Sequence, residues 1–479
     1  MKRFNKILFV VTDVSASYGK ALNPHLGIAM LMAYLDKEGF ETDVIDLQLG
    51  HTVNDVIKRA KEFGADLIGV TMFSFDFINT YAKINEIKKK TGLPLVLGGA
   101  HVSTVKKEVL EKTNADFGII RDGEIPLLEL CSGVPLKEIQ SLIWRDNEIV
   151  ENKVRSLNWE LDKLPFPAYE KFELPKYIHF IDKRLPIETS RGCPYSCNYC
   201  DVKVSLGQAF RPRSPEHVLT EIEHWYSKGF RYFEIVDDVF TMDLDRAKTI
   251  CRGILDRGLK IRWNCANGIR ADRVDEELLL LMKEAGCEFL AYGLETGNKE
   301  MLKIIKKSIN LEKAMETFEL TKKIGLKFAV NFIIGHTEET FARAMDSVRF
   351  AKKIPADYVN FSNMIPYPGT GIFKWVEEQE KLNKARFILP KEEFLKNSTT
   401  KLGKPVFETL SFRYKERVEA LRLGRALAKK SHLQYRMGNF IGGIAYQLSR
   451  NDETYNSLRR FVTGNKFGKK FYNIFRKEY

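Results

Sequence analysis

The sequence predicts an α/β protein made of a doubly wound parallel sheet, a partial (β/α)6 barrel and a basic, mostly helical C-terminal region. Three observations lead to this prediction. Residues 1–138 and 185–395 each alternate short β-branched runs with amphipathic helical patterns. Residues 139–184 between them lose this rhythm and contain three prolines, which indicates a hairpin and a linker. Residues 396–479 combine helical patterns with an excess of Lys and Arg.

Five strands are expected in the first α/β stretch. They are residues 7–11, 44–47, 67–71, 95–97 and 117–120. In a doubly wound sheet, ligands bind at the carboxyl ends of the strands, so the residues that follow each strand are binding candidates. Gly98 and Gly99 directly follow the fourth strand, and without a Cβ atom they let a ligand approach the backbone closely. An ordinary tight turn explains the same two glycines equally well.

The second stretch predicts six strand–helix units. Their strands lie near residues 187–189, 232–236, 261–264, 289–292, 328–334 and 358–362. Six units are too few for a closed barrel of eight strands but fit a partial barrel. The active site of such a barrel is expected at the carboxyl ends of its strands.

Composition narrows the class of protein further. A chain of 479 residues with 44% hydrophobic and 29% charged residues is neither a small disulfide scaffold nor a largely disordered protein. The early apolar stretch 7–11 is too short for a signal peptide. The late apolar stretch 437–448 is shorter than the ~20 residues that span a bilayer. We therefore expect a cytoplasmic protein with reduced thiols.

The strongest motif is a C-x3-C-x2-C run that directly follows the first strand of the second stretch. Its cysteines are Cys193, Cys197 and Cys200. Three thiolates at this spacing can bind three irons of a 4Fe–4S cluster and leave the fourth iron open for chemistry. A zinc site is the competing interpretation. Structural zinc almost always takes four ligands, however, and no fourth Cys or His stands at a conventional spacing.

This run resembles the cluster motif of the radical S-adenosylmethionine (SAM) enzymes, and motifs at the ends of later strands extend the resemblance. The resemblance implies that the open iron chelates SAM. It also implies that an electron, from a donor such as flavodoxin or ferredoxin, cleaves SAM to a 5′-deoxyadenosyl radical. The residues expected to contact SAM are Tyr199, Asp237, Asp238, Glu295, Gly335 and Pro366. Asp237 and Asp238 match loosely, because Gly-Gly-Glu is more usual there. Glu295 as a helix-start carboxylate and Pro366 as part of a simple turn remain alternatives.

The first stretch resembles the cobalamin-binding domain that is fused ahead of many radical SAM enzymes. The segments that carry this resemblance are 23–27, 65–71, 98–101 and 115–124. The residues expected to contact cobalamin are Gly27, Thr71, Ser74, Gly98, Gly99, His101 and Glu124. An alternative is that the domain has lost cobalamin and serves as a scaffold.

One departure from the cobalamin-domain pattern affects the expected state of the cobalt. The Asp-x-His-x-x-Gly motif that supplies a cobalt ligand in methionine synthase-like domains is missing, because Asp13-Val14-Ser15 places Ser where His is required. We therefore expect the dimethylbenzimidazole tail to be displaced into the domain, with no protein histidine on cobalt.

The resemblance implies a methyltransferase that acts on an unactivated carbon, with methylcobalamin as the methyl source. Radical rearrangement, cyclisation or coupling, with cobalamin as electron carrier or bystander, remains an alternative. A non-catalytic corrinoid-binding protein is a third hypothesis, against which the complete cysteine triad counts. The substrate is not predicted.

The positive charge of the chain is concentrated in its C-terminal region. Residues 401–479 carry +12 of the net +13, so the two predicted domains are nearly neutral together. Residues 411–430 are typical of a basic amphipathic helix, and Phe467, Phe471 and Phe475 fall on one face of another. Such helices bind anionic bilayers, which suggests a lipid or lipid-linked substrate. A cap over the barrel mouth is slightly favoured, and nucleic acid is disfavoured because no binding module accompanies the charge.

Overall fold

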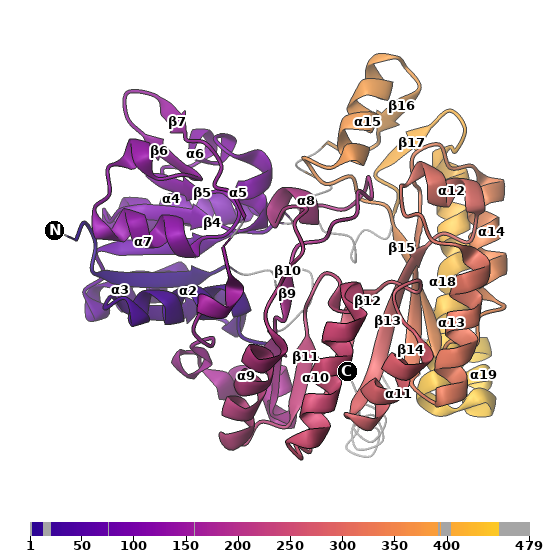
Figure 1. Cartoon of the computed structure of the whole chain (residues 1–479). Coiled ribbons are helices and arrows are strands. Elements are labelled where there is room, and N and C mark those ends of the chain that lie inside the picture. The colour runs from indigo at the N-terminus through magenta and orange to yellow at the C-terminus, as the bar shows by residue number, and fades with distance from the viewer. Residues whose placement is uncertain are drawn as a thin grey trace.

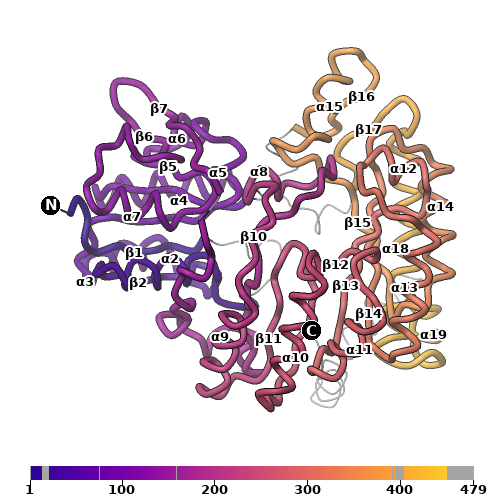
Figure 2. Tube along the Cα trace, viewed as in Figure 1, coloured from indigo at the N-terminus to yellow at the C-terminus, as the bar shows by residue number. Residues whose placement is uncertain are grey.

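A computed structural model describes residues 2–12, 21–74, 76–157, 159–390, 393 and 404–449. The chain forms two large sheets that lie next to each other (Figure 1). A small hairpin and a short helix lie between the two sheets, and the path of the chain from one to the other can be followed in Figure 2.

The N-terminal sheet has seven strands in the order β2-β1-β3-β4-β5-β6-β7. The strands are β1 (Lys6–Val11), β2 (Glu41–Asp46), β3 (Leu67–Thr71), β4 (Leu95–Gly98), β5 (Phe117–Ile119), β6 (Leu142–Arg145) and β7 (Ile149–Glu151). The first five are parallel, as predicted, whereas β6 and β7 pair antiparallel at one edge. The hairpin expected at the start of segment 139–184 therefore extends the N-terminal sheet.

Helices cover both faces of this sheet. They are α2 (Leu26–Lys37), α3 (Val53–Phe63), α4 (Phe77–Thr91), α5 (Ala100–Val105), α6 (Glu108–Lys112) and α7 (Glu124–Ser132). Alternate residues of β1 enter two different hydrophobic cores, with Phe9 in one and Val10 in the other. This burial on both faces explains why β1 is a continuous apolar run. The strand order changes direction between β1 and β3, which is where such sheets bind ligands.

Short 3-10 turns connect the two sheets between residues 161 and 182. The Tyr177 hydroxyl donates a hydrogen bond to Asp46 at the end of β2 (2.6 Å). The Tyr169 hydroxyl donates to the carbonyl oxygen of Pro186 in the second sheet (2.7 Å). The connecting segment is thus bonded to both sheets.

The second sheet has six parallel strands in the order β15-β14-β13-β12-β11-β8. The strands are β8 (Arg184–Ile187), β11 (Tyr232–Ile235), β12 (Arg262–Ile269), β13 (Cys287–Glu295), β14 (Lys327–Ile334) and β15 (Tyr358–Asn363). The helices are α9 (Pro215–Ser227), α10 (Leu244–Asp256), α11 (Glu276–Glu284), α12 (Lys299–Ile304), α13 (Leu311–Ile324) and α14 (Phe341–Ala351). All six predicted strands are present, and the sheet stays open between β8 and β15. The predicted partial barrel is therefore confirmed.

Shorter elements complete the described chain. They are β9 (Ser190–Arg191), α8 (Val202–Ser205), β10 (Arg211–Pro212), α15 (Gly371–Lys381), β16 (Ala385–Phe387), β17 (Phe407–Thr409), α18 (Tyr414–Met437) and α19 (Asn439–Leu448). Among the described helices, none combines the length and the apolar composition needed to cross a bilayer.

Helix α18 packs against the barrel, next to β15 and α14 (Figure 1). Leu421 is 2% exposed, and the guanidinium of Arg417, 1% exposed, donates to the carbonyl oxygens of Gly335 (2.8 Å) and Phe412 (2.9 Å). The predicted apolar stripe of segment 411–430 is thus largely used inside the protein, although Val418 remains exposed. The predicted phenylalanine stripe at 467, 471 and 475 lies outside the described residues.

Enlarging Gly424 tests this packing. A Cβ atom on Gly424 would lie 2.6 Å from a ring carbon of Phe361 on β15. We expect Gly424→Val to lower the free energy of unfolding by about 1–3 kcal/mol, because the helix cannot approach the strand without strain. Denaturant unfolding measures this, with Gly443→Val as control, since a Cβ there meets nothing within 4 Å. Equal destabilisation by both variants would contradict the packing role.

Candidate functional site

The cysteine run forms a loop between β9 and α8 that is anchored at both ends. Gly192 has a φ of +80°, and a Cβ there would lie 2.3 Å from the carbonyl oxygen of Ala209, so only glycine fits. The Gly192 N–H donates to Asp238 (3.1 Å). Further along, the Asn198 N–H donates to the carbonyl oxygen of Ile305 (3.2 Å), and the Asn198 carbonyl accepts from Ile372 N–H (2.9 Å). The loop is therefore held by the ends of three different barrel units.

The three cysteines of the run are free thiols that lie close enough to influence one another. Burial raises the pKa of Cys200 to about 12, with contributions from Asp201, Cys197 and Cys193. Burial also raises the pKa of Cys193. Among the described residues, no three His, Cys, Asp or Glu side chains are arranged to hold one metal ion. A cubane cluster asks for a different arrangement, because each thiolate binds a separate iron.

The two predicted aspartates at the end of β11 differ in their surroundings. Asp237 is buried, and its carboxylate accepts from the Thr189 N–H (2.6 Å), the Thr189 hydroxyl (2.5 Å) and the Ser190 hydroxyl (2.6 Å). Asp237 therefore holds the turn that leads into the cysteine loop. Asp238 is half-buried, and burial followed by the charge of Asp237 raises its pKa to about 7. Of this pair, Asp238 has the carboxylate less occupied by protein donors.

A cavity of about 500 Å³ opens at the carboxyl ends of β12 to β15 and is bordered by α18. Its polar lining residues include Glu295, Asn331, Asn360, Ser362 and Arg425. Amide, hydroxyl and charged groups in a cavity of this size suit a polar small molecule.

Glu295 lies in this cavity in a strained backbone conformation, with a φ of +73°. Its carboxylate pairs with the Lys307 ammonium at 3.2 Å. The next helix, α12, is capped by Asn298, whose side chain accepts from the Met301 N–H (2.9 Å). The capping hydrogen bond of α12 thus comes from Asn298, and the Glu295 carboxylate is held beside the cavity by Lys307.

The turn after β14 lies against the cysteine loop. Gly335 has a φ of +104°, and a Cβ there would lie 2.8 Å from the guanidinium of Arg417. The Tyr199 ring meets the edge of the His336 ring at a centroid distance of 5.5 Å. Pro366 is buried in the segment between β15 and α15, and the start of α15 bonds the cysteine loop through Ile372. His336, next to Gly335, thus contacts Tyr199 of the cysteine loop, and the segment that contains Pro366 leads into the helix that bonds the same loop.

Glu339 supports the Gly335 turn and gives the protein a testable pH dependence. Its buried carboxylate accepts from the N–H groups of Gly335 (2.6 Å) and His336 (3.1 Å). Burial raises the pKa of Glu339 to about 7, while these N–H groups and Arg417 oppose the shift. The folded state thus binds a proton that the unfolded state has released above about pH 4.5, so stability falls as pH rises from about 4.5 to 7.

We expect Glu339→Gln to remove this contribution, because the amide oxygen still accepts from the turn but does not ionise. Between pH 4.5 and pH 7, the free energy of unfolding of the variant should rise relative to that of the parent by up to about 3 kcal/mol. Denaturant unfolding at pH 4.5, 5.5 and 7 measures the difference. A constant difference across this range would contradict the assignment to Glu339.

A second cavity, of about 180 Å³, lies at the carboxyl ends of the N-terminal strands and the start of α2. Five of the residues predicted to contact cobalamin line it: Gly27, Thr71, Gly98, Gly99 and Glu124. A Cβ on Gly99 would lie 2.6 Å from the Met72 carbonyl oxygen, so this turn requires glycine. Because Gly98 and Gly99 have no side chains, a ligand can approach the backbone closely at this part of the cavity wall.

The other two predicted cobalamin residues do not line the cavity. Ser74 and His101 contact each other at 3.2 Å. The His101 ring is buried, stacks on Phe77 (4.9 Å) and bonds the Tyr81 hydroxyl (2.7 Å). His101 is therefore held by residues next to the Gly98-Gly99 turn and lies outside the lining of the cavity.

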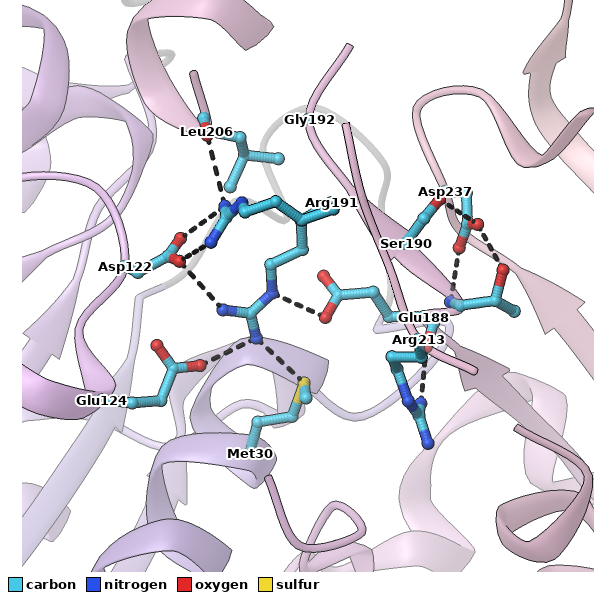
Figure 3. A network of polar contacts seen from close by, with 12 residues as sticks. Met30, Asp122, Glu124, Glu188, Ser190, Arg191, Gly192, Leu206, Arg213 and Asp237 are labelled. Carbon is cyan, nitrogen blue, oxygen red and sulfur yellow. Dashed lines mark hydrogen bonds and ion pairs between the residues drawn. The ribbon is translucent and has the colours of Figure 1, made fainter. Parts of the chain in front are cut away.

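Arg191 connects this cavity to the cysteine loop, and sequence reasoning did not single it out. Figure 3 shows its buried guanidinium among three carboxylates, two of which come from the N-terminal unit. Arg191 bonds Glu188 (2.7 Å) and Glu124 (2.8 Å) and lies 3.6 Å from Asp122, which also pairs with Arg211. Since Arg191 lies two residues before Cys193, the two predicted cofactor regions are neighbours.

Known protein families match both predicted cofactor regions of the chain. The radical SAM superfamily matches residues 187–351, and the B12 binding domain matches residues 15–131. An uncharacterised methyltransferase of Pyrococcus horikoshii is 30% identical, covering 77% of this chain and 83% of its own. Cytidylyl-2-hydroxyethylphosphonate methyltransferase of Streptomyces wedmorensis is 28% identical over 65% of this chain and 68% of its own.

Two solved structures share the fold. The cobalamin-dependent SAM radical enzyme OxsB, with aqua-cobalamin and SAM bound, has a TM-score of 0.75 and 17% identity, covering 99% of this chain and 75% of its own. The radical SAM methyltransferase TsrM of Kitasatospora setae, with cobalamin and a 4Fe–4S cluster bound, has a TM-score of 0.67 and 21% identity, covering 81% of this chain and 77% of its own.

Fold and site together define an enzyme that combines a radical SAM barrel with a B12 binding domain. The chain belongs to the family of cobalamin-dependent radical SAM enzymes. Its cofactors are a 4Fe–4S cluster, SAM and cobalamin, and its chemistry needs an external one-electron reductant.

Proposed function

We propose that this enzyme methylates an unactivated carbon of its substrate. The observation that carries the proposal is the Arg191 network, which joins the wall of the N-terminal cavity to the strand that leads into the cysteine loop. Methyl transfer to a carbon requires the radical-forming cofactor and the methyl carrier close to one substrate. When bound, the cluster with SAM supplies hydrogen-atom abstraction, and cobalamin supplies the methyl group.

Each predicted region has its own part in this proposal. Residues 1–138 hold cobalamin, residues 139–184 connect the two domains, and residues 185–395 hold the cluster and SAM. Residues 396–479 are the basic C-terminal region, of which α18 packs against the barrel. Cys193, Cys197 and Cys200 bind the cluster irons. Asp237 holds the strand before them, and Glu295 with Asp238 offers carboxylates for the polar groups of SAM.

The products of SAM decide between methylation and other radical chemistry. The reconstituted enzyme is incubated with cobalamin, labelled SAM, dithionite and candidate substrates. Co-production of S-adenosylhomocysteine and 5′-deoxyadenosine, with label in the substrate, supports methylation, because one SAM is used for each role. Formation of 5′-deoxyadenosine alone contradicts it.

Rearrangement or cyclisation is the second candidate function. One relative that favours it is the anaerobic magnesium-protoporphyrin IX monomethyl ester cyclase of Rubrivivax gelatinosus, which is 24% identical over 77% of this chain and 69% of its own. The same labelling experiment identifies this outcome, since the substrate then changes without gaining a labelled methyl group.

We propose that flavodoxin or ferredoxin in a reducing cytoplasm donates the electron that is needed for SAM cleavage. A reducing compartment suits the cysteine triad, which must stay reduced to bind iron. SAM cleavage is measured with reduced flavodoxin or reduced ferredoxin in place of dithionite, and we expect cleavage with at least one of them. No cleavage with either protein donor would contradict this part of the proposal.

Peripheral membrane contact is a further part of the proposal, and α19 supports it. Phe440, Ile441 and Ile444 are 80%, 54% and 47% exposed. Apolar side chains on one face of a helix in a basic region suit an anionic bilayer. We expect a Phe440→Ser, Ile441→Ser variant to lose partition onto vesicles that contain phosphatidylserine, whereas the control Val418→Ser on α18 keeps it. Equal partition of all three proteins would contradict membrane contact.

A further inference from the structure

Helix α18 borders the cavity of about 500 Å³ at the open edge of the barrel. β15 is the edge strand there, and α18 packs next to it (Figure 1). Arg425 and Ala428 lie on one face of the helix and line the cavity. His432, on the same face, bonds Asn360 of β15 (2.8 Å). The C-terminal region therefore contributes side chains to the barrel cavity, in addition to packing against the barrel.

Two neighbouring strands present one polar face to this cavity. Asn331 of β14 pairs with Asn360 of β15 across the sheet, and Ser362 follows on the same face of β15. The buried residues Phe332 and Phe361 alternate with them along the two strands. Half-buried polar side chains that interrupt apolar strands at the wall of a cavity suit a polar ligand.

A chain of hydrogen bonds sets the direction of the Asn331 side chain. The Asn360 amide N–H donates to the Asn331 oxygen (2.8 Å), and the Asn360 oxygen accepts from Nε2 of His432 (2.8 Å). Burial lowers the pKa of His432 to about 4, so its ring is neutral at neutral pH and carries its hydrogen on the donating Nε2. The Asn331 oxygen is used in this chain. Asn331 therefore offers its N–H groups to the cavity, where no described residue accepts from them.

The charged side chains at the cavity favour an anionic ligand. Glu295 is an acidic residue of the lining, and the Lys307 ammonium pairs with it at 3.2 Å. Arg425 is a basic residue of the lining, and a guanidinium has enough N–H donors to keep a contact within the protein and still bind a ligand. Guanidinium groups bind carboxylate and phosphate oxygens through paired hydrogen bonds. With the N–H groups of Asn331, the cavity offers a cationic and a neutral donor to one group of anionic oxygens.

We propose that the substrate carries a carboxylate or phosphate group, and that Arg425 and Asn331 bind this group in the barrel cavity. Glu295, which is proposed to contact SAM, lines the same cavity. An anionic group held by Arg425 therefore brings the rest of the substrate next to the cofactor, as hydrogen abstraction requires. This inference rests on the proposed methyl transfer, because the ligand of the cavity is taken to be the substrate of that reaction.

Binding of two probe anions tests the site. Inorganic phosphate and acetate are titrated into the reconstituted full-length enzyme with cobalamin and SAM bound. Calorimetry measures their dissociation constants at one ionic strength, which is held constant with chloride, and the affinity for SAM is measured in a separate titration. The variants are Arg425→Gln, Asn331→Asp and the control Arg422→Gln. Arg422 lies on the same helix but is exposed and pairs with Glu419 (2.6 Å). Thermal unfolding checks that each variant folds.

We expect Arg425→Gln to weaken binding of the tighter anion about ten- to hundredfold, the effect of hydrogen bonds to a charged group. Asn331→Asp keeps the shape of the side chain and the oxygen that accepts from Asn360, but it replaces the N–H groups by a negatively charged oxygen. Anion binding should then fall below detection, because like charges repel. Arg422→Gln should bind both anions as the parent does. The tighter anion in the parent identifies the substrate group as phosphate or carboxylate.

Four outcomes would overturn the inference. Binding of neither anion by the parent would show that the cavity is not an anion site. Equal anion affinity of the parent and Arg425→Gln would exclude Arg425, and unchanged binding in Asn331→Asp would exclude Asn331. A loss of SAM affinity in Arg425→Gln as large as the loss of anion affinity would assign Arg425 to SAM instead.

The labelling experiment with SAM tests the proposed function separately. Anion binding that depends on Arg425, without label in any substrate, would contradict methyl transfer but not the anion site. Label in neutral substrates, and in none that carries a carboxylate or phosphate, would contradict the anionic substrate while supporting methyl transfer. The two failures are therefore distinguishable.

Discussion

Replacing Cys193, Cys197 or Cys200 by serine is expected to abolish both the iron–sulfur absorption and the cleavage of SAM. Three thiolates leave one iron of the cluster open, and removal of one leaves a second iron without a protein ligand, so the cluster is lost. The other four cysteines are buried in a hydrophobic core and cannot take the place of a lost ligand; they are Cys131, Cys251, Cys265 and Cys287. The iron and sulfide content of each reconstituted variant and its yield of 5′-deoxyadenosine with dithionite measure the effect.

Cys251 provides the control for these substitutions. It is fully buried away from the loop, and burial raises the pKa of its thiol to about 12, as for Cys200. Cys251→Ala should therefore keep the full cluster content and SAM cleavage, with only a modest loss of stability. A triad variant that retains a cluster, or a parent protein that takes up one zinc ion and no iron, would contradict the assignment.

The strands were predictable from sequence because parallel strands are buried on both faces. In β1 and β3 this burial gives nearly continuous apolar runs. In the barrel, polar residues that line the cavity interrupt the runs, as Asn331 does in 328–334. The strand-end rule followed from the same pattern. It placed Glu295 at the cavity that opens at the carboxyl ends of the barrel strands, where residues of β14 and β15 also lie although they are far apart in sequence.

The use of each side chain was not predictable, because it depends on partners from distant segments. Asp237 stands at a strand end, but Thr189 and Ser190 occupy its carboxylate. His101 comes shortly after a pair of glycines, but its ring stacks on Phe77 and does not line the N-terminal cavity. The strand-end position locates a residue near the site without determining whether its polar atoms remain available.

The positions of elements that are held by tertiary contacts could not be predicted from the sequence either. The basic helix at 411–430 has the pattern of an interfacial helix, yet Gly424 lets α18 lie against Phe361 on β15. Arg191 was visible only as a neighbour of the cysteines. Its partner Glu124 is 67 residues away, and a lone arginine gives no signal of such a pairing.

Replacing Arg191 by methionine is expected to lower the free energy of unfolding by about 3–5 kcal/mol, the effect of leaving buried charges without their partner. Methionine keeps much of the aliphatic stem but removes the guanidinium that bonds Glu124 and Glu188. Asp122 retains Arg211, so the loss falls mainly on the two glutamates. Denaturant unfolding of the apo protein measures the loss, and weaker cobalamin binding should accompany it, because Glu124 lines the N-terminal cavity.

A control arginine and the pH dependence separate this charge effect from a loss of packing. Arg59 is half exposed and pairs with Asp43, so the protein should lose little stability when Arg59 is replaced by methionine.

Burial already raises the pKa of Glu188 above its usual 4.5, and Arg191 opposes that shift. Without Arg191 the pKa of Glu188 rises further, so the folded variant binds protons that the unfolded chain has released, and its stability falls as pH rises above about 4.5. The difference between parent and Arg191→Met should therefore shrink toward acid pH, and in the double variant Arg191→Met, Glu188→Gln it should be smaller at pH 7. A defect that is independent of pH and unchanged by Glu188→Gln would mean that Arg191 acts through packing alone, since neutralising a carboxylate cannot repair a lost apolar contact.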